Sequence, residues 1–343
     1  MALYGAMVLF RSASSVSQST PGSQRYLLRF CSRFLVESVP PSEKGLWYLH
    51  FTYGASPGNL FLFADRPHRY DKVVISEINR LSPSDFTKLV RSVDNATDGS
   101  HYLISTGPLS SDRTMSERKV ASSYILGECC KKIFGDRVEE IKKLYDTLRN
   151  EPTTSTTARM IFQYRAHQFL QMGRVLEFLP LLGRNSPEGE GIIYEDYASR
   201  NPKHASLPKL KERVVTDETG TRLGYDTYYR PQSNSFPTID SWVLVQHHPH
   251  DTPTFLTFQI TTDMEQHEVK RSGLDKVDKL DIPFGARRYL VVLTPTGVKP
   301  KVTVPMDYLT DMFSRGYGVD MASKFLVFHY QVDNNVLFGP RTS

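Results

Sequence analysis

The hydrophobic pattern is clearest in the second half of the chain, where short apolar runs rich in β-branched and aromatic residues predict strands. A charged segment between the second and third runs, residues 267–280, fits a helix. Ser186-Pro187-Glu188 is typical of a helix cap and first turn, which predicts a helix over residues 192–197. The predicted strands are 239–245, 255–261, 289–293 and 325–332. Helix, hairpin, helix and strand in this order indicate an α/β fold.

In the first half, apolar runs separated by Gly54, Pro57 and Gly58 predict short strands, and Pro83 predicts the first turn of a helix. The predicted strands are 46–49, 59–63 and 73–75, and the predicted helices are 82–90, about 119–149 and 162–176. The run of proline and threonine at 151–157 is the clearest linker, so we place the domain boundary there. The predicted parts are an N-terminal segment (1–44), a first domain (45–150), a linker with a connecting helix (151–185) and a second domain (186–343).

Composition narrows the class of protein. The chain has 343 residues, which favours two domains, and its 39% hydrophobic and 23% charged content is typical of a globular protein. A formal net charge of +5 is compatible with a polyanionic partner but does not demonstrate one. Three cysteines exclude a disulfide framework and favour a reducing compartment. No run of eighteen apolar residues occurs, so we expect no membrane span.

The first 36 residues contain several arginines and many serines but no acidic residue before Glu37. Such a composition is compatible with an organelle transit peptide. A secretory signal would need a cleaner apolar core than residues 2–10 and a basic residue before it. A tail, or a remnant of a longer ancestor, is the interpretation that we favour.

Two polar residues stand out within the predicted hairpin. Residues 247–253 form a turn-like run, and a hairpin symmetric about Pro249 and His250 places opposite each other residues whose numbers add up to 499. Asp240 and Gln259 are such a pair, with Cβ atoms expected about 5 Å apart on one face. A carboxylate and an amide oxygen at that spacing can share one hard cation. A buried carboxylate without such a partner would be costly.

Other candidate residues flank this pair. His267 and Lys270 begin the helix that follows the second strand of the hairpin, and Glu195 lies on a predicted helix that could pack beneath the hairpin. Two acids, an amide oxygen and a lysine are the ingredients of a metal-dependent phosphodiesterase. In that chemistry the metal activates water and neutralises charge on the phosphate, while the lysine stabilises the pentacovalent oxyanion.

Each of these residues also has a purely structural interpretation. Asp240 could satisfy a strand end, Gln259 could be an ordinary hydrogen-bonded strand residue, and Glu195 could be a solvated acid. Lys270 and His267 could be exposed helix residues. The histidines of the predicted turn could bind a transition metal, although hairpin tips tolerate polar clusters freely.

Several segments, in their order and spacing, resemble the Crinkler and retrotransposon-hot-spot family of eukaryotic effectors, whose C-terminal domain is similar to restriction endonucleases. The resemblance covers a little over half of the chain, from about residue 100 to 300. The segments are 100–104, 120–125, Gly191-x-x-Tyr194-Glu195, Tyr228-Tyr229-Arg230-Pro231, Phe236-Pro237-Thr238-Ile239-Asp240-Ser241, Phe258-Gln259-Ile260-Thr261, His267-x-x-Lys270 and Tyr289-Leu290-Val291-Val292-Leu293-Thr294-Pro295.

The resemblance implies a restriction-endonuclease-like mixed sheet of the Asp-(Asp/Glu)-x-Lys type with flanking helices. A smaller α/β or mostly helical domain, a remnant of an NTPase module, would precede it. Glu195, Asp240 and Gln259 would bind Mg²⁺ or Mn²⁺, and Asp240, Gln259, Lys270 and His267 would be the catalytic residues. The chain departs from the wider pattern, since glutamine replaces an acid and Thr261 stands at the usual lysine position. No P-loop sequence is present, so we expect no ATP binding.

The function that the resemblance implies is hydrolysis of host DNA by a secreted effector that acts in the host nucleus. DNA and host nuclear proteins would be its partners, and the oligomeric state stays open. A nuclease-like effector that binds DNA or a host protein without cutting is the alternative, and a truncated, non-functional copy is a third reading.

Overall fold

The structure is a computed structural model that describes most of the chain after residue 41. The described residues are 42–54, 56–91, 100–108, 114–135, 137–187, 191–197, 202–215, 222–231, 238–248, 250–262, 266–308 and 325–339. The predicted N-terminal tail or targeting segment therefore lies outside the described residues, except for its last three. The chain divides into two compact units. The first is Met1–Gly135 with Pro152–Thr154, and the second is Asp136–Glu151 with Ser155–Ser343.

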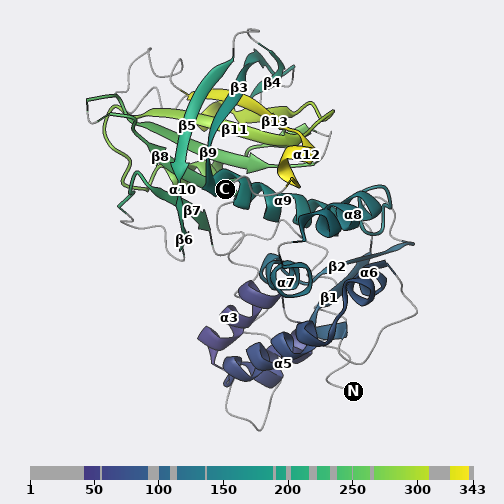
Figure 1. The fold of residues 1–343 in the computed structure, drawn as a ribbon. Helices are drawn as coiled ribbons and strands as arrows, with labels where there is room; N and C mark the ends of the chain where they lie inside the picture. The colour runs from purple at the N-terminus through teal and green to yellow at the C-terminus, as the bar shows by residue number, and fades with distance from the viewer. Residues whose placement is uncertain are drawn as a thin grey trace. The chain divides into compact units, whose positions relative to one another are not determined.

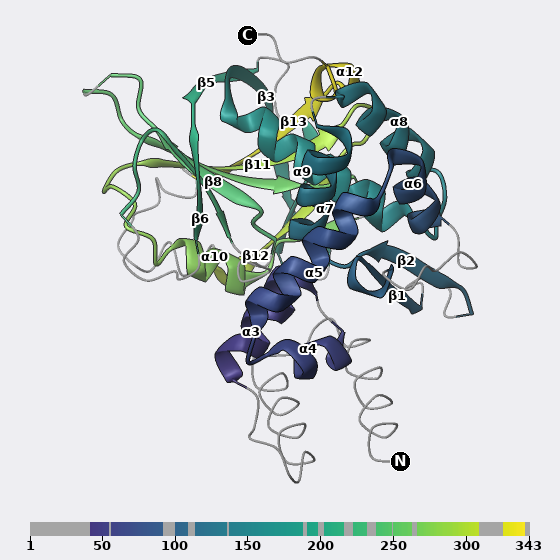
Figure 2. The same cartoon turned by 60° about the horizontal axis from the view of Figure 1, so that its bottom comes forward.

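The first unit is mostly helical, with one two-stranded antiparallel sheet. Its elements are α3 (Glu43–Tyr53), α4 (Pro57–Phe63), α5 (Pro67–Arg80), α6 (Pro83–Arg91), η1 (Ser100–Tyr102), β1 (Ile104–Pro108), β2 (Ser116–Val120), α7 (Ser123–Cys129) and η2 (Cys130–Phe134). Helix α5 packs against α3, α4 and α7, and the hairpin of β1 and β2 packs against α6 and α7 (Figure 2).

The predicted strands of this unit are wrong, because residues 46–49, 59–63 and 73–75 lie in α3, α4 and α5. Side-chain caps start two of these helices: Ser42 accepts a hydrogen bond from the backbone of Gly45, and Ser56 accepts one from Asn59. Gly54, with a φ of 58°, ends α3 in the left-handed conformation. Short apolar runs fit either a helix or a strand, and the caps favour the helix for α3 and α4, whereas α5 has no side-chain cap. The predicted helix at 82–90 is confirmed as α6.

The second unit is built on one large mixed sheet. Its helices are α8 (Val138–Leu148), α9 (Ser155–Gln171), α10 (Arg271–Val277) and α12 (Asn334–Leu337). Its strands are β3 (Met172–Asn185), β4 (Gly191–Tyr197), β5 (Lys203–Lys209), β6 (Lys211–Val215), β7 (Thr227–Pro231), β8 (Ser241–Val245), β9 (Thr254–Ile260), β10 (Gln266–Glu268), β11 (Arg287–Pro295), β12 (Lys301–Pro305) and β13 (Phe325–Val332). The strand order is β10-β12-β4-β3-β13-β11-β9-β8-β7-β6, and β5 pairs with β3 (Figure 1).

A compact β-β-β-α-β unit lies at the centre of this sheet. Strands β7, β8 and β9 are antiparallel neighbours, and α10 leads from the β9–β10 segment to β11, which is parallel to β9. Strand β13 continues the sheet in parallel with β11. The predicted mixed α/β character is therefore confirmed, and the strands predicted at 239–245, 255–261, 289–293 and 325–332 correspond to β8, β9, β11 and β13.

Two predicted helices differ from the structure. The stretch 119–149 is not one helix: it contains the end of β2, then α7, η2 and α8, and Gly135 with a φ of 55° interrupts it. Helix α8 belongs to the second unit, whereas the linker at 151–157 would have placed it in the first. The helix predicted over 192–197 is strand β4, paired with β3 and β12. Helix α9 ends at Gln171, so the helix predicted at 162–176 is correct only in its first part.

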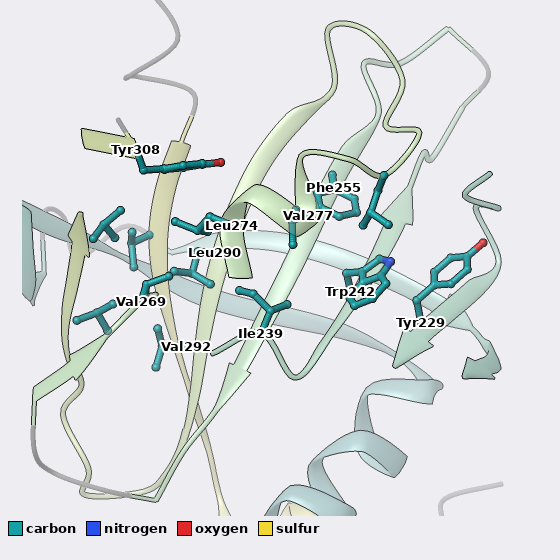
Figure 3. Close-up of a cluster of buried hydrophobic side chains, with 14 of the residues drawn as sticks. Tyr229, Ile239, Trp242, Phe255, Val269, Leu274, Val277, Leu290, Val292 and Tyr308 are labelled. Carbon is teal, nitrogen blue, oxygen red and sulfur yellow. The ribbon is translucent and has the colours of Figure 1, made fainter. Parts of the chain in front are cut away.

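One hydrophobic cluster of the second unit lies on the face of the sheet that α10 covers. Figure 3 shows Trp242 stacked on Tyr229, with ring centroids 6.1 Å apart, and Leu274 and Val277 of α10 in the same cluster as Leu290 of β11. Trp242 and Leu290 are fully buried. This packing fixes the position of α10 on the sheet, and with it the position of Lys270, which immediately precedes the helix.

Candidate active site

The predicted pairing of the β8–β9 hairpin is confirmed. Ser241 faces Phe258 and Trp242 faces Thr257, so the residue numbers of each pair add up to 499. Asp240 comes one residue before β8, and the paired residues of the hairpin end at Ser241 and Phe258, so the predicted direct opposition of Asp240 and Gln259 is not part of the ladder. The backbone N–H of Asp240 donates to the carbonyl of Phe258 at 2.9 Å, which keeps Asp240 beside β9. Asp240 and Gln259 thus lie together at one end of the hairpin.

The carboxylate of Asp240 is held by the backbone of β9. Its Oδ2 accepts a hydrogen bond from the N–H of Ile260 at 2.6 Å, and the residue is half-buried. Burial raises the pKa of Asp240 to about 7, and the hydrogen bond from Ile260 lowers that pKa only in part. Asp240 therefore gains or loses its proton near neutral pH, and a bound cation would favour the ionised form.

The amide of Gln259 is buried without a full set of partners. The residue is 6% exposed, and its Oε1 has no hydrogen-bond partner among the described residues. A buried oxygen that accepts no hydrogen bond is costly, so this atom is a candidate ligand. In the sheet Gln259 is paired with Val292 of β11, which offers no polar group.

The segment before Asp240 connects the hairpin to Lys270. Thr238 has a φ of 71°, which is rare for a β-branched residue and marks local strain. Its Oγ1 accepts a hydrogen bond from the backbone N–H of Lys270 at 3.2 Å. Lys270 occupies the N-cap position of α10, and its side chain is exposed. The structure therefore brings Lys270 to the loop that carries Asp240.

Helix α9 supplies polar side chains that sequence reasoning missed. Gln163 donates to the carbonyl of Ile260 at 3.2 Å, and His167 lies 2.7 Å from the hydroxyl of Tyr228, which donates to Ser241 at 2.6 Å. Burial, with a smaller effect of nearby Arg230, lowers the pKa of His167 to about 3, so the imidazole is neutral. These residues position the ends of β8 and β9 next to Asp240. Gln163 and His167 lie one helical turn apart, but α9 carries many other polar residues, so the sequence held no clear signal for them.

Glu195 is not where the sequence predicted. It lies on strand β4 instead of on a helix, and it forms ion pairs with Arg184 and with Lys301, the latter at 3.8 Å. Four strands separate β4 from β8 in the sheet order. Among the described residues, no hydrogen bond or ion pair joins Glu195 to Asp240 or to Gln259. The predicted packing of a Glu195 helix beneath the hairpin is therefore wrong.

His267 also differs from its prediction. The helix predicted from 267 begins only at Arg271, and His267 lies in β10, paired with Val302 of β12. Its side chain lies outside the described part of the structure, so its predicted catalytic role stays a prediction.

The donor atoms at the hairpin end fit a hydrated, hard cation. Within the described ranges no three His, Cys, Asp or Glu side chains are close enough to hold a metal, and this includes the histidines of the hairpin tip. Mg²⁺, however, commonly binds through one or two protein oxygens, completing its shell with water and substrate phosphate. One carboxylate from Asp240 and the unpartnered amide oxygen of Gln259 match that smaller set.

None of the described helices has both the length and the apolar character to cross a lipid bilayer. Comparison of the chain with protein-family models, with curated proteins and with solved structures finds no match.

Proposed function

We propose that the chain is a metal-dependent nuclease that hydrolyses phosphodiester bonds in DNA. The observation that carries the proposal is that Asp240 lies beside the end of β9, where its carboxylate accepts a hydrogen bond from Ile260, the residue after the buried Gln259. The order β7, β8, β9, α10, β11 supports the restriction-endonuclease-like core that the family resemblance implies. Following the same resemblance, we propose a Crinkler-type effector that acts on DNA in a host nucleus.

Three residues have distinct roles in this proposal. Asp240 and Gln259 would hold Mg²⁺ or Mn²⁺ through a carboxylate oxygen and the amide oxygen. When bound, the cation lowers the pKa of a water molecule and neutralises charge on the phosphate. Asp240 must lose its proton to bind the cation, so occupancy should rise with pH through about 7. Lys270, exposed at the start of α10, would stabilise the charged phosphate in the transition state.

A second candidate function is DNA binding without cleavage. The observation that favours it is the small number of carboxylates at the hairpin end among the residues that the structure describes. Helix α9, which contacts the end of β9 through Gln163, contains no Asp or Glu. Glu195 forms ion pairs with Arg184 and Lys301 instead of lying at the site. A site with one acid binds a divalent cation weakly, which would lower turnover while leaving DNA contacts intact.

One experiment distinguishes the two functions. Purified full-length chain is incubated with supercoiled plasmid in Mg²⁺, in Mn²⁺ and with a chelator, and DNA binding is measured in parallel at several salt concentrations. We expect cleavage that needs the cation and is lost with the chelator. Salt-dependent binding without cleavage would favour the second candidate. Absence of both would contradict both functions.

A further inference from the structure

Arg118 is a buried cation in the first unit. It lies in the middle of β2, and its side chain is only 5% exposed. It shares a face of the hairpin with Val120, which is fully buried, and β2 packs against α6 and α7. The buried residues of α6 are Phe86, Leu89 and Val90, so this environment is largely apolar.

Two nitrogens of the Arg118 guanidinium have no partner among the described residues. Its backbone N–H donates to the carbonyl of Thr153 at 3.1 Å, so the main chain is satisfied. Its Nε and Nη1, in contrast, are sealed from solvent and make no hydrogen bond, and no described residue forms an ion pair with it. Leaving a buried charge unpaired costs several kcal/mol, which makes a bound counter-ion the physical expectation.

The register of the hairpin places Arg118 next to exposed residues, from which such an ion can reach it. Arg118 is paired with Thr106, which is exposed. Away from the turn, the next pair on this face is Ile104 with Val120, and both residues are buried. Toward the turn, the next pair on this face is Pro108 with Ser116, and both residues are exposed. Arg118 is thus the last buried residue of β2 before the exposed pair at the turn end of the hairpin, next to a hydroxyl that can donate.

We propose that Arg118 and Thr106 form a binding site for an oxyanion, a phosphate or carboxylate group, in the first unit. The planar guanidinium donates N–H groups in one plane and matches an anion that offers two oxygens from one centre. The site is separate from Asp240 and needs no P-loop. It does not depend on the nuclease function, because it belongs to a different unit of the chain.

The test is thermal melting and calorimetric titration of the full-length chain with inorganic phosphate, with acetate and with chloride at equal ionic strength. The variants are Arg118→Met, which keeps the apolar stem and removes the charge, and Thr106→Val. Lys119→Met is the matched control, since it removes the same charge from the exposed face of the same strand. We expect phosphate or acetate, but not chloride, to raise the melting temperature of the wild type and of Lys119→Met.

In Arg118→Met that rise should disappear, and in Thr106→Val the affinity should fall about tenfold, as expected for one lost hydrogen bond to an ion. A larger response to phosphate than to acetate would identify a phosphate group, and the reverse a carboxylate. An equal rise in Arg118→Met and wild type would overturn the proposal. So would the absence of any response to both oxyanions in the wild type. If Arg118→Met does not fold, an unchanged affinity in Thr106→Val would also contradict it.

Discussion

Asp240→Asn is expected to lower metal-dependent cleavage of DNA by about a thousandfold, which corresponds to about 4 kcal/mol of transition-state stabilisation. Asp240 is the one described carboxylate at the end of the hairpin, so its loss removes the strongest ligand from a site that is already short of charge. Asparagine can still accept the hydrogen bond from Ile260, so the fold should survive. The measurement is the rate of plasmid cleavage in Mg²⁺ and in Mn²⁺, with circular dichroism to confirm folding.

Asp251→Asn is the matched control for this change. Asp251 lies in the turn of the same hairpin, is exposed, and accepts a hydrogen bond from the backbone of His248. The substitution removes the same charge about 20 Å from Asp240, the length of a strand such as β9. Cleavage by this variant should match that of the wild type. If wild type and Asp240→Asn cut DNA equally, the activity comes from another site or from a contaminant.

In the absence of metal, Asp240→Asn should also raise the stability of the folded chain, and the size of this gain should depend on pH. The folded-state pKa of about 7 lies above the ordinary value of 3.8, so the folded chain holds the proton more tightly than the unfolded chain. The wild type therefore loses stability as pH rises from about 4 to 7, and the penalty is complete above pH 7. Because Asp240 is only half-buried, we expect a gain of about 2 kcal/mol for the variant at pH 8. That corresponds to about 4–8 °C in melting temperature.

The measurement is the difference in melting temperature between the variant and the wild type, with a chelator present, at pH 5 and pH 8. The gain at pH 5 should be less than half of that at pH 8. Buried His167 and His329, whose pKa values burial lowers to about 3 and about 4, destabilise both proteins as pH falls below 6.5. Their effect therefore cancels in the difference. A gain that is equal at both pH values would show that Asp240 is not the titrating group.

The pairing of the two hairpin strands was predictable from the sequence because the evidence is local. A short polar turn with apolar runs on both sides specifies which residues face each other, and one buried face then fixes the register. Ser241 and Phe258 pair as this reasoning requires. The parallel strand β11 was predictable for a similar reason, since a Val- and Leu-rich run is typical of a strand buried on both faces.

The position of Glu195 was not predictable in this way because it depends on distant parts of the chain. Strand β4 pairs with β12, more than a hundred residues away, and a Cβ on Gly191 would lie 2.5 Å from the carbonyl oxygen of Val304. The cap-like Ser186-Pro187-Glu188 suggested a helix there, whereas Ile192, Ile193 and Tyr194 are typical strand residues and pair with neighbouring strands. The polar residues of α9 were missed because their role depends on contacts with Tyr228 and Ile260 that appear only in the folded chain.

The position of Mn²⁺ in crystals of the full-length chain, located by anomalous diffraction, tests the proposed site most directly. We expect one peak at metal–ligand distance from a carboxylate oxygen of Asp240 and from Oε1 of Gln259, at a pH above 7, where Asp240 is ionised. The same crystals of Asp240→Asn should lack the peak. A peak at Glu195 or at the hairpin tip instead, or no peak at an Mn²⁺ concentration that supports cleavage, would contradict the account.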